Sequence, residues 1–190
     1  MAELYVCADA NFFTDKPDSQ FKTTEDYNNY LIERWNSVVK DRDIVLIVGD
    51  FSHGSLEETK KLLSQLNGNK EILDYQENEL SQKITEEEWR DLGVKLMSHA
   101  NGWIKGEIEG KATDVILVVN PHCFEVCKDV YFCAAASLIK TDERFKNNCL
   151  NLSINLWDYT PVKYNLIPQM IDNAILFESM NNEEINLNEK

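Results

Sequence analysis

Residues 43–50 read Asp-Ile-Val-Leu-Ile-Val-Gly-Asp. The run between the two aspartates is apolar without interruption. A strand that faced water on one side would alternate apolar and polar residues, so this pattern predicts a central strand covered on both faces. The Gly-Asp pair directly after the run predicts that the strand ends at residue 48 or 49, with Asp50 at its carboxyl end.

The segments on either side of this strand predict alternating strands and helices. Apolar Leu4 to Ala8 reads as a second buried strand. Thr24 is expected to cap a helix whose inward face carries five side chains at helical spacing, namely Tyr27, Tyr30, Leu31, Trp35 and Val38. Ser55 is expected to cap another helix that ends at Asn67-Gly68, and a third strand follows over 70–75. This order predicts an α/β layered core with right-handed crossovers.

The remainder of the chain predicts mainly strands. After a short helix over 85–92, strands are expected over 103–108, 115–119, 130–136 and 150–157, the last one ended by Asp158 to Pro161. A final short helix is expected over 170–177 and a polar, frayed tail over 181–190. No repeat or linker interrupts the pattern, so residues 1–180 are expected to form a single domain.

Composition limits the possible functions. The chain has 190 residues, of which 43% are hydrophobic and 27% charged, and its formal net charge is −14. These values exclude a disordered or disulfide-scaffold protein. The negative charge disfavours direct binding to nucleic acid or to a membrane surface. No apolar run of about 18 residues is present, and no signal peptide is evident at the N-terminus, so a cytoplasmic location is expected. The odd set of cysteines is expected to be free thiols, consisting of Cys7, Cys123, Cys127, Cys133 and Cys149.

Several stretches together resemble a known family. They are the segments 5–11, 35–39, 43–51 and 66–70, followed by 102–110 and 157–162. In this order and spacing, over roughly residues 3–165, the chain resembles the calcineurin-like metallophosphoesterases of the small prokaryotic and phage type. The resemblance implies a four-layer α/β/β/α sandwich. It also implies a site for two divalent metals at the carboxyl ends of the central strands, where the metals activate water for attack on a phosphoryl group.

Compared position by position, the chain departs from the family's metal site. Asp9 and Asp50 match the family's aspartates, and Asp50 corresponds to the carboxylate that bridges both metals. Asn11 replaces the histidine of Asp-x-His. The family's Gly-Asn-His-Asp loop corresponds to residues 75–78. The family's histidine before a proline is replaced by Asn120, and its Gly-His-x-His loop corresponds to residues 137–140. The resemblance therefore nominates a vestigial site made of Asp9, Asn11, Asp50, Gln76, Glu77, Asn78, Asn120 and Lys140.

Few good metal ligands remain among these residues, because amide oxygens bind Mn or Zn weakly. No metal cofactor is therefore expected, and we hypothesise that an ion cluster of Asp9, Lys140 and Asp50 takes the place of the metals. His53, three residues after Asp50, is a further residue that could face the site. His122 could take the place of Asn120 if the loop shifts, and His99 is expected to be structural.

Three functions follow as alternatives. The favoured one is a pseudoenzyme, a catalytically degenerate phosphoesterase fold that acts as a binding or inhibitory module for a protein partner. The second is an active metal-dependent phosphoric ester hydrolase with Mn or Mg held by Asp9, Asp50, Asn120 and His122. The third is an acidic inhibitor that occupies the basic surface of a nucleic-acid-processing enzyme.

Overall fold

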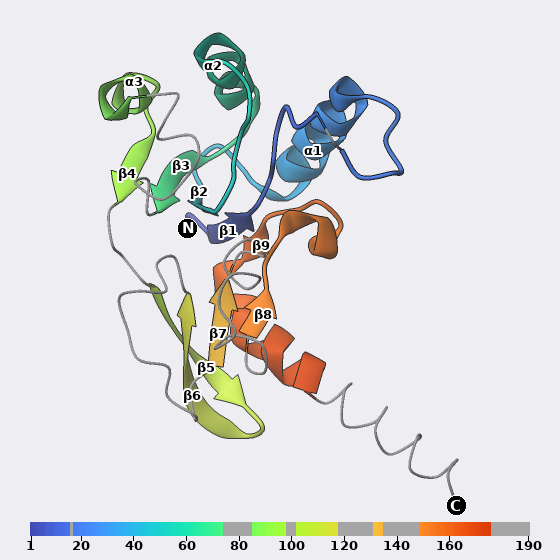
Figure 1. Cartoon of the computed structure of the whole chain (residues 1–190). Helices are drawn as coiled ribbons and strands as arrows, with labels where there is room; N and C mark the ends of the chain where they lie inside the picture. The colour runs from blue at the N-terminus through green and yellow to red at the C-terminus, as the bar shows by residue number, and fades with distance from the viewer. Residues whose placement is uncertain (16, 74–84, 98–101, 118–130, 135–148, 176–190) are drawn as a thin grey trace, which may run out of the picture.

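The structure is a computed structural model that describes residues 1–15, 17–73, 85–97, 102–117, 131–134 and 149–175 (Figure 1). In these residues two mixed β-sheets are stacked, and helices lie on the outer face of the first sheet. The α/β class predicted from the sequence is therefore confirmed.

The first sheet has the strand order β4-β3-β2-β1-β9. Its strands are β1 (Leu4–Ala8), β2 (Ile44–Val48), β3 (Asn69–Leu73), β4 (Lys95–Met97) and β9 (Val162–Lys163). The first four run parallel, whereas β9 is antiparallel to β1. Ala8 pairs with Val48 at the carboxyl ends of β1 and β2, so the chain leaves both strands at the same edge of the sheet.

Three helices pack on one face of this sheet: α1 (Thr24–Val38), α2 (Leu56–Gln65) and α3 (Glu86–Asp91). Each begins at a hydroxyl residue whose side chain accepts a hydrogen bond from a backbone N–H of the first turn. Ser55 with Glu58, and Thr85 with Glu88, form complete capping boxes.

The second sheet has the order β5-β6-β7-β8 and consists of β5 (Gly102–Ile108), β6 (Lys111–Leu117), β7 (Tyr131–Ala134) and β8 (Cys149–Asn151). β5 and β6 form a hairpin whose two turn residues, Glu109 and Gly110, both have positive φ. This turn geometry matches the twist of paired strands. β6, β7 and β8 run parallel to one another.

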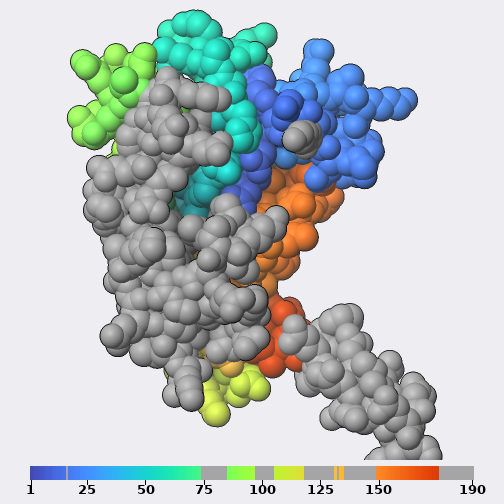
Figure 2. All heavy atoms as spheres, viewed as in Figure 1, coloured from blue at the N-terminus to red at the C-terminus, as the bar shows by residue number. Residues whose placement is uncertain are grey.

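Strand β1 contributes to both halves of the hydrophobic core. Tyr5 and Cys7 are buried among the side chains of the three helices, whereas Val6 and Ala8 are buried against the second sheet. Figure 2 shows the C-terminal part of the described chain directly beneath the N-terminal residues, in agreement with the pairing of β9 with β1. A strand buried on both faces needs apolar residues at consecutive positions, which is the pattern seen in the sequence.

Some boundaries differ from the sequence predictions. The strand predicted over 150–157 is wrong in its second half, because β8 ends at Asn151 and Ile154–Trp157 forms a 3-10 helix, η5. The N–H of Ser153 bonds to the Asn151 side chain, and the Tyr159 N–H bonds to the Ile154 carbonyl, so the chain coils after β8. The first helix is capped by Thr23 instead of Thr24.

The C-terminal part of the described chain carries elements that extend or add to the prediction. The short 3-10 helix η6 (Tyr164–Leu166) leads into a helix over 167–175, which begins earlier than predicted. The two short strands β4 and β9 were not predicted. The tail over 181–190 lies outside the described residues.

The cysteine and membrane predictions are settled in part. Cys7 and Cys133 are buried free thiols and Cys149 is a partly buried one, whereas Cys123 and Cys127 lie outside the described residues. In the described part of the chain, no helix combines the length and the apolar character that a bilayer crossing requires.

Candidate functional site

The loops that follow β1 and β2 meet at the carboxyl edge of the first sheet. Their backbones continue the strand pairing, because the N–H groups of Asp9 and Asn11 donate to the carbonyls of Val48 and Asp50 at 3.1 and 3.0 Å. The His53 N–H then donates to the Phe12 carbonyl at 2.7 Å. The two loops are therefore held together by main-chain bonds and place their side chains in a fixed relation.

Left-handed backbone is concentrated in these loops. Asp9 and Asn11 both have φ of 49°, Phe13 has φ of 60°, and Gly49 has φ of 68°. For residues other than glycine this conformation costs about 1 kcal/mol each, so other bonds must compensate. Helix α1 supplies two of them, because Tyr27 donates its hydroxyl to the Ala10 carbonyl at 2.9 Å and Asn28 accepts the Phe13 N–H at 3.0 Å.

Among the described residues, two hydrogen bonds reach the Asp9 carboxylate. Its Oδ2 accepts a hydrogen bond from the Ser153 hydroxyl at 2.7 Å, and its Oδ1 accepts a longer one from the Asp50 N–H at 3.4 Å. The Ser153 bond joins the end of β1 to the segment after β8, where a backbone bridge pairs Ala8 with Ser153. Burial, together with the nearby negative charge of Asp9, raises the pKa of the Cys7 thiol.

Asn11 and His53 form a side-chain pair at the same edge. The Asn11 Nδ2 donates to the Asp9 carbonyl at 2.9 Å, which leaves its Oδ1 as the acceptor. His53 Nε2 lies 2.8 Å from that oxygen, so this nitrogen carries the proton and donates. While it donates, it has no lone pair with which to bind a metal.

The structure thus brings together three of the eight nominated residues, Asp9, Asn11 and Asp50, and adds His53. The other five lie outside the described residues, namely Gln76, Glu77, Asn78, Asn120 and Lys140. His99 and His122 also lie outside them. The ion cluster that includes Lys140 therefore stays a prediction.

Ser153 and Asn151 were missed by sequence reasoning. Asn151 accepts the Ser153 N–H at 2.9 Å and so orients the residue that binds Asp9. Both residues were assigned to the first half of a strand over 150–157, where their side chains carry no signal of a site. Only the early end of β8 places them at the carboxyl edge of the second sheet.

The described residues supply only part of the nominated donor set. Across the part of the chain that the structure describes, no group of three or more His, Cys, Asp or Glu side chains is arranged to hold a metal ion. The two carboxylates are accompanied by the Asn11 amide, which is a weak ligand for Mn or Zn, and by His53, whose Nε2 is engaged by Asn11. We therefore derive no reaction step through a metal.

Comparison with known proteins gives relatives without an assigned function. No family model matches the chain. The uncharacterized protein MJ1445 of Methanocaldococcus jannaschii is 23% identical over 199 residues, which cover 95% of this chain and 98% of that protein. The crystal structure of the protein of unknown function AQ665 from Aquifex aeolicus has a TM-score of 0.56 and 15% identity, covering 90% of this chain and all of that one. The second likeness shows a shared fold and carries no activity with it.

Proposed function

We propose that this chain is a catalytically degenerate protein of the calcineurin-like metallophosphoesterase fold that acts as a binding or inhibitory module. Support comes from the stacked mixed sheets, from helices on the outer face of the first sheet, and from Asp9 and Asp50 at its carboxyl edge. A four-layer sandwich of that family is part of the proposal.

The observation that carries the proposal is the hydrogen-bonded network at this edge. One oxygen of Asp9 takes the Ser153 hydroxyl, and the Asn11 amide oxygen takes the His53 imidazole. Polar groups of the two loops are thus bonded to one another and to Ser153. Such a network holds the loops together.

The first experiment measures metal binding by thermal melting. A site that binds Mn, at 100 times its dissociation constant, would stabilise the chain by about 2.7 kcal/mol, or a rise in Tm of roughly 5 to 10 °C for this length. We expect no such rise for the purified chain in excess MnCl2 relative to excess EDTA. We also expect elemental analysis of the never-chelated protein to find no stoichiometric Mn, Zn or Fe.

The matched control is Asp50→Asn, which keeps the shape of the side chain and removes its charge. Wild type and variant should show the same melting behaviour with Mn and the same lack of turnover of bis(4-nitrophenyl) phosphate. One or two equivalents of metal, or turnover that disappears in the variant, would overturn the proposal. That result would establish the hydrolase alternative, with Asp9 and Asp50 as ligands.

The partner is proposed to be a protein with a basic surface, because the chain carries a net charge of −14. Its affinity should then fall steeply as salt rises from 50 to 500 mM. An interaction unaffected by salt would contradict this part of the proposal. If the partner is an enzyme that acts on nucleic acid, the chain should inhibit it in competition with the nucleic acid.

A further inference from the structure

A groove of about 690 Å³ lies along β9, at one end of the first sheet. It is lined by the last residue of α1 and by residues of the segment that contains η5, β9 and η6. Figure 1 shows this segment in orange, next to β1, with which β9 pairs. Two leucines line the groove, Leu156 from η5 and Leu166 from η6.

Both leucines are unusually exposed. Leu156 is 55% exposed and Leu166 is 44% exposed, and apart from Met1 they are the exposed large hydrophobic side chains among the described residues. A single exposed leucine is ordinary on a folded protein, whereas an apolar patch that gathers several such side chains marks a surface that contacts another molecule. The position of both leucines at one groove therefore indicates an interaction surface.

The polar groups of the groove are bonded within the chain. The Tyr5 hydroxyl donates to the Val38 carbonyl at 3.1 Å, and the Trp157 indole N–H donates to the Asn151 carbonyl at 2.9 Å. The Thr160 hydroxyl donates to the Trp157 carbonyl at 2.7 Å. Because these donors are already used, a partner on this face is held mainly by the burial of apolar surface.

The edge of β9 is poorly suited to pairing with a further strand. β9 consists of the two residues Val162–Lys163, and Pro161 directly before it has no backbone N–H. Short strands and proline are features that prevent a sheet edge from adding another strand. A partner on this face is therefore held by side chains, and the sheet is not extended.

The charge of the groove differs from that of the whole chain. The chain carries a net charge of −14, whereas the groove is lined by one acidic and one basic side chain, Asp158 and Lys163. Asp158 is paired with Arg34, and Lys163 is paired with Glu3. Two acidic chains repel each other overall, so they approach most easily at a face where the charge is balanced. A partner with a basic surface, in contrast, finds no excess of carboxylates among these residues.

We propose that this groove is the contact face of a homodimer, in which Leu156 and Leu166 of each copy pack into the groove of the other. In a two-fold arrangement the same face serves both subunits, so each copy supplies the protruding leucines and also the hollow that receives them. Eleven residues line the groove, fewer than the roughly 20 to 30 that each partner contributes to a standard interface. The dimer is therefore in equilibrium with the monomer.

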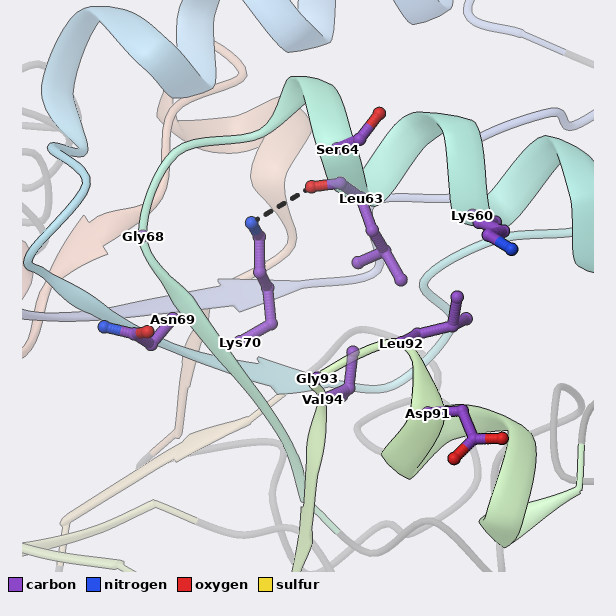
Figure 3. Close-up of a pocket in the computed structure, with 10 residues that line it drawn as sticks. All are labelled: Lys60, Leu63, Ser64, Gly68, Asn69, Lys70, Asp91, Leu92, Gly93 and Val94. Carbon is purple, nitrogen blue, oxygen red and sulfur yellow. Dashed lines mark hydrogen bonds between the residues drawn. The ribbon is translucent and has the colours of Figure 1, made fainter.

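A second hollow on the chain lacks these features. It has a volume of about 300 Å³ and lies between the second half of α2, the start of β3 and the turn after α3 (Figure 3). Its leucines, Leu63 and Leu92, are buried or half-buried, and Lys60 and Lys70 lie on its two sides. None of the residues that line it is an exposed large hydrophobic residue, so its exposed Ser64 is a suitable control position.

The test measures the mean mass of the full chain by sedimentation equilibrium between about 5 and 200 μM, in 50 and in 500 mM NaCl. We expect this mass to rise with concentration from that of the monomer toward twice that value. Because salt screens the repulsion between two acidic chains, we expect more dimer at 500 mM than at 50 mM. A basic partner shows the opposite dependence, so this proposal and the proposed function fail separately. A pure monomer at 200 μM in 500 mM NaCl would overturn the homodimer.

Two variants test whether the leucines form the contact. Leu156→Asp and Leu166→Asp each place a charge in the buried face, and we expect each to weaken the dimer by about tenfold or more. Both side chains are exposed, so circular dichroism should show that the variants remain folded. Ser64→Asp adds the same charge in the second hollow and should leave the dimer unchanged. A dimer that is unaffected by both leucine variants, or that Ser64→Asp weakens equally, would contradict the proposed contact.

Hydrogen exchange of the wild-type chain locates the contact without any substitution. Peptides that cover residues 154–166 should exchange more slowly at 200 μM than at 5 μM, because dimerisation covers them, whereas peptides of α2 should exchange equally at both concentrations. If the chain dimerises and exchange over 154–166 does not change, the contact lies elsewhere and the proposal is wrong.

Discussion

Replacing Ser153 by alanine tests whether the contact between the two sheets at Asp9 stabilises the fold. The hydroxyl is buried and donates to the Asp9 carboxylate at 2.7 Å. A hydrogen bond to a charged group contributes about 1.5 to 3 kcal/mol, and the partial exposure of Asp9 places the effect near the lower end. We expect Ser153→Ala to lower the free energy of unfolding by about 1.5 kcal/mol, or Tm by roughly 3 to 6 °C.

The assay is urea unfolding followed by circular dichroism for a double-mutant cycle of Ser153→Ala and Asp9→Asn. Asparagine tolerates the left-handed backbone at position 9, so the second variant removes the charge without adding strain. We expect a coupling energy of about 1 kcal/mol between the two changes. Ser37→Ala is the matched control, because the Ser37 hydroxyl bonds only within the exposed surface of α1, and it should change stability by less than about 0.5 kcal/mol. A coupling energy near zero would refute the reasoning.

Three further predictions concern a cap, a glycine and a thiol. Hydrogen bonds from the Ser55 hydroxyl and backbone N–H lower the pKa of the Glu58 carboxyl below its usual 4.5. The charged Glu58 side chain therefore stabilises the fold above pH 4.5, and this stabilisation is lost as the pH falls through the lowered pKa of the folded state. The Tm difference between wild type and Glu58→Gln at pH 7 should therefore shrink at pH 3, and a constant difference would contradict this. Gly106→Ala should lower the free energy of unfolding in urea by about 1 to 3 kcal/mol, because the new Cβ would lie 2.2 Å from Pro168. An unchanged urea midpoint of unfolding would show that Pro168 can move away. Burial raises the pKa of Cys7, so the native chain should protect this thiol from iodoacetamide until it unfolds, and native labelling as fast as in urea would count against its burial.

The parts of the fold that the sequence predicted have strong local signals. The uninterrupted apolar run before Gly49 predicted β2, and Ser55 as a cap predicted the start of α2. The short strands β4 and β9 were missed because two or three residues carry no periodicity. Such strands form because a neighbouring strand already offers its free edge.

The candidate site was predictable only where sheet geometry governs it. Parallel strands β1 and β2 end at the same edge, so the proximity of Asp9 and Asp50 follows from their positions after the strands. Ser153, which binds Asp9 from the segment after β8, is 144 residues away in the sequence. That contact depends on where β8 ends and on how the two sheets stack, and neither is encoded in local spacing.

The left-handed backbone at position 11 limits which replacements the loop can accept. Asparagine is among the few residues other than glycine that adopt this conformation readily, and its side chain can bond to nearby backbone, as Asn11 does with the Asp9 carbonyl. A β-branched residue at this position would strain the loop and disturb Ala10 and Phe12 on either side. The replacements that position 11 can accept without strain are therefore few, and asparagine is one of them. Among related sequences, position 11 should accordingly vary between asparagine, aspartate, histidine and glycine, even where the neighbouring polar residues have changed freely.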